Sequence, residues 1–150
     1  MEIELAEALW VLGKLPAEAL PEVACEALAK GADGPALRQL AGLQNPTRRE
    51  VDDLFERALA ELGRKLPSKR DAGLYFAKNI ASKIISGEVE PYEGARQIWM
   101  EVWNECGRPE ELTVFVGLAD GYEDEPQHQE AYRKDIIDEA KKLVSSPRLA

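Results

Sequence analysis

Prolines and glycines divide this sequence into short segments, most of which carry the three- and four-residue spacing of amphipathic helices. Pro21, Pro35 and Pro91 stand where helices would begin, and Gly31 and Gly63 stand where helices would end. A proline in the first turn loses no hydrogen bond, and a glycine beyond the last turn readily adopts the left-handed conformation that closes a helix. The pattern therefore predicts an all-α chain.

These boundaries predict about eight helices. Thr47 and Glu50 form a Thr-x-x-Glu capping box, in which each side chain accepts a backbone N–H at the start of a helix. The expected helices span residues 2–12, 21–30, 35–43, 47–62, 71–86, 91–106, 109–119 and 128–144. Residues 145–150 are expected to fray. Because short loops favour antiparallel neighbours, the expected fold is a compact bundle of short antiparallel helices.

The segment Leu112–Ala119 is apolar on all sides and admits two interpretations. Its Thr, Val and Phe residues favour a strand locally. A lone strand, however, would find no partner elsewhere in the chain for its backbone hydrogen bonds. We therefore expect a central, buried helix, followed by an acidic loop over residues 120–127.

The length of 150 residues predicts one domain. A basic connector, Arg64–Arg70, could divide it into halves spanning residues 1–63 and 71–150. The two cysteines, Cys25 and Cys106, have apolar neighbours and are expected to be buried, reduced thiols. No apolar run approaches the roughly 20 residues of a membrane span, and the first residues lack the basic start of a secretion signal. The chain is therefore expected to be cytoplasmic.

The formal charge of −9 is unevenly distributed. Residues 1–63 contain 12 acids and 6 bases, residues 64–108 contain 6 acids and 8 bases, and residues 109–150 contain 10 acids and 5 bases. Such a field opposes nucleic-acid binding, which needs clustered cations. It favours either simple solubility or a basic partner protein.

The sequence lacks the residues that several kinds of catalytic and metal site require. His128 is the only histidine, which excludes zinc sites with two histidine ligands, and no phosphate-binding glycine loop is present. No catalytic constellation, cofactor or metal site is therefore predicted. One enzymatic alternative stays open, a Mg²⁺- or Mn²⁺-dependent hydrolase that uses acids at helical spacing. The candidate pairs are Asp120 and Glu123, Asp135 and Asp138, and Glu101 and Glu105.

Adjacent aromatic residues suggest a second alternative. Tyr75 and Phe76 face different ways on a helix, and Trp103 is rotated by about forty degrees from Trp99. One ring of each pair could reach the surface and support a structural or regulatory scaffold that self-associates. A homo-oligomer is therefore compatible with the sequence.

The segments Pro91–Trp99 and Gly107–Ala119, together with the run Pro35–Leu43, resemble segments of small, uncharacterised all-helical bacterial proteins. The resemblance covers about a third of the chain. It implies a bacterial origin and a stand-alone domain, and it carries over no activity and no catalytic residue.

The leading functional hypothesis is a non-enzymatic domain that binds a basic protein. An inhibitor of the immunity or antitoxin type is its most concrete form. The expected binding residues are the carboxylates of Asp120, Glu123, Asp124 and Glu125, which would steer the partner, and Tyr122, which would anchor it.

Overall fold

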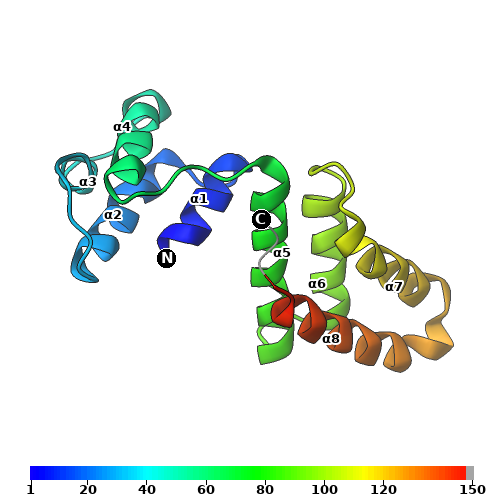
Figure 1. The fold of residues 1–150 in the computed structure, drawn as a ribbon. Coiled ribbons are helices and arrows are strands. Elements are labelled where there is room, and N and C mark those ends of the chain that lie inside the picture. The colour runs from blue at the N-terminus through cyan, green and yellow to red at the C-terminus, as the bar shows by residue number, and fades with distance from the viewer. Residues whose placement is uncertain (148–150) are drawn as a thin grey trace. The chain divides into compact units, whose positions relative to one another are not determined.

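The computed structural model describes residues 1–147, and within this range the chain forms eight α-helices and no strand, which confirms the all-α prediction. The last three residues of the tail that was predicted to fray, 148–150, lie outside the described residues. The helices are α1 (Ile3–Val11), α2 (Leu20–Ala29), α3 (Pro35–Ala41), α4 (Arg48–Glu61), α5 (Lys69–Ser86), α6 (Pro91–Gln97), α7 (Thr113–Asp124) and α8 (Gln129–Ser145). They form two compact units, Met1–Ala72 and Gly73–Ala150 (Figure 1). No helix in the described residues is long and apolar enough to cross a membrane.

In the first unit, α1 to α4 enclose one apolar core. The ring of Trp10 packs edge-on against Phe55, with 5.8 Å between the ring centroids, and both side chains are buried. The capping box of Thr47 and Glu50 is present as predicted and starts α4. Gly63 follows α4 with φ +70°, a left-handed conformation that glycine adopts without steric cost.

A long-range cap starts α3. The carboxylate of Glu61, at the end of α4, accepts the backbone N–H groups of Ala36 and Leu37 at 3.0 and 3.3 Å. A Cβ atom on Gly34 would lie 2.4 Å from this carboxylate, so a larger residue there would displace the capping side chain. An anion at a helix N-terminus is stabilised by unpaired N–H groups and by the helix dipole.

The basic connector is not a fully solvated linker. The Arg64 guanidinium donates from Nε and Nη2 to the two carboxylate oxygens of Glu7, each at 2.8 Å. Glu7 is 5 % exposed and lies on α1, so this bidentate pair fixes the connector to its own unit. Lys69 and Arg70, expected in the connector, begin α5.

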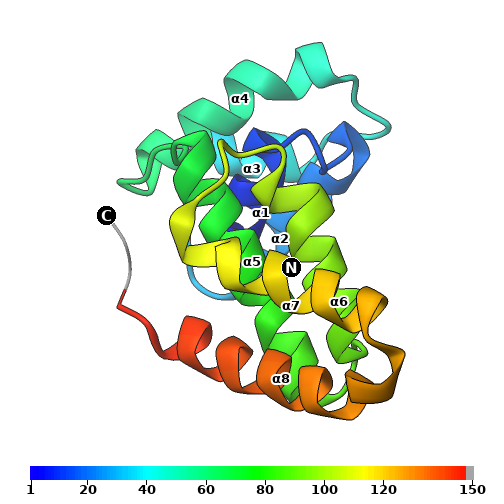
Figure 2. The same cartoon turned by 90° about the vertical axis from the view of Figure 1, so that its right-hand side faces the viewer.

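In the second unit, α5 from Gly73 onward and α6 to α8 pack around the buried side chains of Ile80, Ile98, Phe115 and Ile136. Helix α6 continues without a break into a π-helix over Ile98–Trp103, where the sequence predicted an uninterrupted α-helix. The burial of Ile98, Val102 and Cys106 places the π-helical turn against the core. Figure 2 shows α7 with no helix of its unit in front of it.

The prediction of a buried Cys25 is wrong. Its neighbours Val23 and Ala24 are buried, but Cys25 is exposed, while Cys106 is buried as predicted. Successive residues on a helix point about 100° apart, so Cys25 lies off the apolar face that its neighbours share. Ile85 is 39 % exposed, next to the buried Ile84.

Candidate functional site

Helix α7 includes most of the segment that was expected to be an acidic loop. Asp120, Tyr122, Glu123 and Asp124 all lie in the helix, and only Glu125 stands beyond its end. Gly121, which favoured a loop in the sequence, has a packing role, because a Cβ atom there would lie 2.5 Å from the ring of Tyr132. The close approach of α8 explains the glycine, and the helix continues through it.

Helix α7 is also less buried than its apolar sequence predicted. Phe115 and Ala119 are buried, but Val114 is 39 % exposed and Thr113 and Gly117 are exposed as well. The helix therefore lies at the surface of its unit, with one face in the core and the opposite face open.

Three carboxylates at the end of α7 are exposed and project from its last turns. Within residues 1–147, Asp120, Glu123 and Asp124 form no ion pair, and the last turn of α7 contains no basic residue. No ion pair within these residues therefore compensates their charges.

Tyr122 is a half-buried part of the framework and not a free anchor. Its ring stacks on Tyr92 of α6, with 4.3 Å between centroids and 14° between planes. Its hydroxyl accepts a hydrogen bond from Arg133 Nη2 at 2.9 Å, and Arg133 Nε donates to Glu90 at 3.2 Å. The hydrogen bond to the Glu90 carboxylate is the main cause that raises the pKa of Arg133. The network joins α6, α7 and α8.

Glu125 is likewise held by its own unit. The hydroxyl of Tyr132 donates a short hydrogen bond to the Glu125 carboxylate. This hydrogen bond, followed by burial, raises the pKa of Tyr132 above its ordinary value. Of the five predicted binding residues, Asp120, Glu123 and Asp124 are thus exposed, while Tyr122 and Glu125 support them.

The tyrosine stack brings a second acidic segment to the site. Burial, and then the negative charge of Glu123, raise the pKa of Tyr92, and Glu93 in the first turn of α6 acts in the same direction. Glu93 and Glu123 therefore both lie near the Tyr92 hydroxyl, although 30 positions separate them in the sequence. We call Glu93, Asp120, Glu123 and Asp124 the acidic surface. Sequence reasoning missed Glu93, because only the packing of Tyr92 on Tyr122 connects the two segments.

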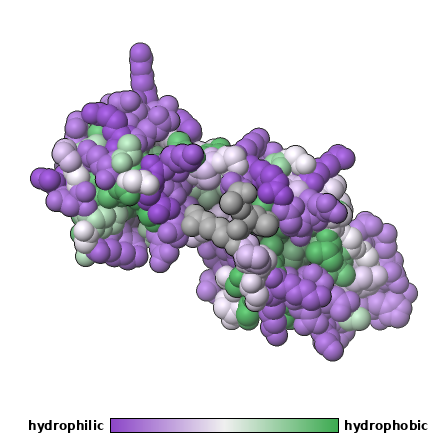
Figure 3. Space-filling model, viewed as in Figure 1, coloured by the Kyte–Doolittle hydropathy of each residue, from purple (hydrophilic) through white to green (hydrophobic). Residues whose placement is uncertain are grey.

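The visible face of the second unit carries mainly hydrophilic side chains, with a hydrophobic area among them (Figure 3). Both kinds of surface are thus available on this unit. The hydrophobic area by itself defines no function, since folded proteins expose apolar atoms widely.

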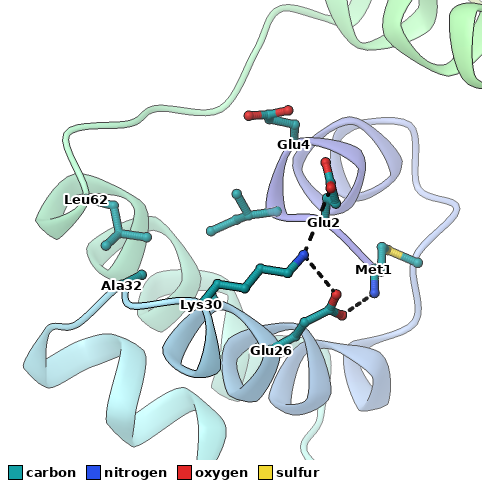
Figure 4. A pocket seen from close by; sticks show the side chains of 9 residues that line it. Met1, Glu2, Glu4, Glu26, Lys30, Ala32 and Leu62 are labelled. Atoms are coloured by element: carbon teal, nitrogen blue, oxygen red, sulfur yellow. Dashed lines mark hydrogen bonds and ion pairs between the residues drawn. The ribbon is translucent and has the colours of Figure 1, made fainter.

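A small pocket of about 280 Å³ lies in the first unit (Figure 4). Its lining comprises Met1, Glu2, Ile3, Glu4, Glu26, Ala27, Lys30, Ala32 and Leu62. The Lys30 ammonium lies 3.2 Å from Glu26 and 3.9 Å from Glu2. Hydrogen bonds from the Met1 amino group and from Lys30 lower the pKa of Glu26. Glu2 and Glu26 are therefore paired with the two cations of the lining, the Met1 amino group and Lys30.

The structure also places the residues of the two alternative functions, the metal-dependent hydrolase and the self-associating scaffold. Among residues 1–147, no three histidine, cysteine or carboxylate side chains are placed to share a metal ion. Phe76 is buried, whereas Tyr75, Trp99 and Trp103 are half-buried. The Trp103 indole donates to Thr113 Oγ1 at 3.2 Å, at the first residue of α7.

Comparisons of the chain with protein-family models, with curated proteins and with solved structures found no match.

Proposed function

We propose that this protein is a non-enzymatic, acidic binding domain whose partner presents a basic protein surface. The acidic surface is the contact region, and an inhibitor of the immunity or antitoxin type is the concrete form of this function. One observation carries the proposal. The end of α7 holds three exposed carboxylates that no cation of the described residues neutralises.

The position of these carboxylates is unfavourable for the free protein. A helix carries a partial negative charge at its C-terminal end, and an acidic side chain there costs about 0.3–1 kcal/mol at low ionic strength. Glu123 and Asp124 lie in the last turn of α7, Asp120 lies one turn earlier, and no lysine or arginine of the same helix offsets them. Residues that oppose local stability without compensation are expected at functional sites. A basic side chain of a bound partner would offset this repulsion between the carboxylates and the end of the helix.

The framework beneath the acidic surface supports binding without rearrangement. The Tyr92–Tyr122 stack and the Arg133 hydrogen bonds fix the end of α7 to α6 and α8. A surface that is already ordered loses little conformational entropy when its partner arrives. The net charge of −9 adds long-range attraction, which accelerates the association of a basic partner.

The proposal is tested with the charge-reversed variant Glu123→Lys/Asp124→Lys. Wild type and variant are immobilised, and proteins are captured from a lysate of the native host at low and high salt. The expected result is one basic protein that wild type retains in stoichiometric amount at low salt and that high salt releases. With the purified pair, charge reversal should slow association by about tenfold or more at low salt.

The matched control is Glu130→Lys. Glu130 is also exposed and lies on the same unit, but it stands in the first turn of α8. It should associate nearly as fast as wild type. Equal association rates for wild type and the Glu123/Asp124 variant would refute the proposal. Capture of only this same chain, at every salt concentration, would replace it with self-assembly.

A further inference from the structure

The exposed side of α7 forms a continuous face along the helix. At 3.6 residues per turn, Thr113, Val114, Gly117, Asp120 and Asp124 fall within an arc of about 120°. All five are exposed. We call this set the α7 face. Its first half is small and apolar, and its second half is acidic.

Gly117, at the centre of the α7 face, has no role in the packing of its own unit. A Cβ atom there would meet no other atom within 4 Å, whereas one on Gly121 would lie 2.5 Å from the Tyr132 ring and one on Gly94 would lie 2.5 Å from Ile84. A glycine within a helix costs about 1 kcal/mol relative to alanine. This cost brings nothing to the free protein, but a bare backbone permits the close approach of another chain.

Two apolar side chains, Val114 and Trp103, lie at the beginning of α7. Val114 is 39 % exposed, and the half-buried indole of Trp103 lies against Thr113 through its 3.2 Å hydrogen bond. One turn beyond Gly117, the carboxylates of Asp120 and Asp124 begin the acidic half. The α7 face thus offers an apolar contact and a charged contact in line along one helix.

We infer that the α7 face docks an amphipathic helix of the basic partner. The partner helix crosses α7 closely at Gly117, covers Val114 and Trp103 with small or apolar side chains, and places lysines or arginines against Asp120 and Asp124. This inference rests on the proposed function and specifies the element that the partner supplies. Charge decides between occupants, because a second copy of α7 carries no basic residue and would bring more carboxylates to the same face.

The test uses two substitutions that should leave the free protein folded. Gly117→Ala and Gly117→Leu both introduce better helix formers into open space, so both should raise the melting temperature. Gly117→Leu, however, places a bulky side chain at the centre of the α7 face, where it would block the close approach of another helix. Loss of binding in this variant therefore cannot come from unfolding.

The probe is a fluorescently labelled synthetic helix of about 15 residues, slightly longer than α7. It has an alanine- and leucine-rich face and lysines grouped at one end. A scrambled peptide of the same composition controls for charge alone. In fluorescence anisotropy, wild type should bind the helical peptide at least about tenfold more tightly than the scrambled one, and Gly117→Leu should abolish the difference.

The outcomes separate this inference from the proposed function. If wild type binds both peptides equally, or if Gly117→Leu binds the helical peptide as wild type does, helix docking on α7 is overturned. The electrostatic proposal then still stands or fails on Glu123→Lys/Asp124→Lys. Charge reversal could also leave peptide binding unchanged while Gly117→Leu removes it. In that case the contact between the partner's basic groups and the carboxylates of α7 is wrong, both in this inference and in the proposed function.

Discussion

Removing the charges of Glu123 and Asp124 is expected to stabilise the free protein, although both residues are exposed. In the variant Glu123→Gln/Asp124→Asn, the two side chains keep their size and lose only their charge. Both lie in the last turn of α7, where the unpaired carbonyl groups and the helix dipole repel negative charge. A surface substitution without such a conflict would leave stability nearly unchanged.

The magnitude follows from the helix dipole. Each charge at the end of a helix contributes about 0.5 kcal/mol at low ionic strength, so the pair should contribute about 1 kcal/mol. For a chain of 150 residues, this corresponds to a rise in melting temperature of about 2–4 °C. Because salt screens exposed charges, the rise should shrink at high ionic strength.

Thermal unfolding followed by circular dichroism at low and high salt measures the effect. The control, Glu130→Gln, removes one negative charge from the first turn of α8, where the dipole favours it. The control should therefore lower the melting temperature slightly. If both variants shift the melting temperature in the same direction, net charge and not helix position governs stability, and our argument about α7 is refuted.

Three further predictions concern other interactions. Glu61→Ala should cost about 1 kcal/mol in chemical denaturation because α3 loses its cap, while Glu56→Ala, exposed on the same helix, should cost little; equal costs would contradict the cap. Arg64→Met should cost about 2 kcal/mol by leaving the buried Glu7 carboxylate unpaired, and adding Glu7→Leu should recover most of the loss. Since the fold raises the pKa of Tyr132, its contribution to stability is complete below about pH 10 and is lost as the pH rises through the raised pKa; Tyr132→Phe should reduce this alkaline loss, and identical pH profiles would refute it.

Local chemistry explains why the helices were predictable from the sequence. The capping box of Thr47 and Glu50 and the closing turn at Gly63 act over a few residues, so the sequence shows them directly. The choice of helix over strand for residues 112–119 was also correct, because it depended on the need to pair backbone groups within the chain.

Contacts between distant segments explain the errors. Gly121 resembles a loop residue until the Tyr132 ring is placed against it. Arg64 resembles a solvated linker residue until Glu7 is found beside it, 57 positions away in the sequence. The exposure of Cys25 depends on which face of α2 is turned to the core, and the apolar character of its sequence neighbours does not determine that face. For Gly121 and Arg64 the deciding contact is tertiary and leaves no local pattern.

The candidate site was predictable only in part. The acids of residues 120–125 were visible as a cluster, and three of them are exposed as the hypothesis requires. The stack of Tyr92 on Tyr122, which adds Glu93 and removes Tyr122 as a free anchor, depends on how α6 packs against α7. Side-chain identity therefore indicated the charge of the surface, and packing determined its extent.

The most direct test of the account is a nuclear magnetic resonance titration of the isotope-labelled protein with the lysine-headed helical peptide. The backbone amide shifts identify where the peptide binds. We predict that the largest changes fall on α7 and on the start of α6, around Glu93, Gly117 and Asp124, and that they disappear in Glu123→Lys/Asp124→Lys. Changes of similar size at exposed carboxylates throughout the chain, or changes confined to residues 1–72, would contradict the claim that the acidic surface is the binding site.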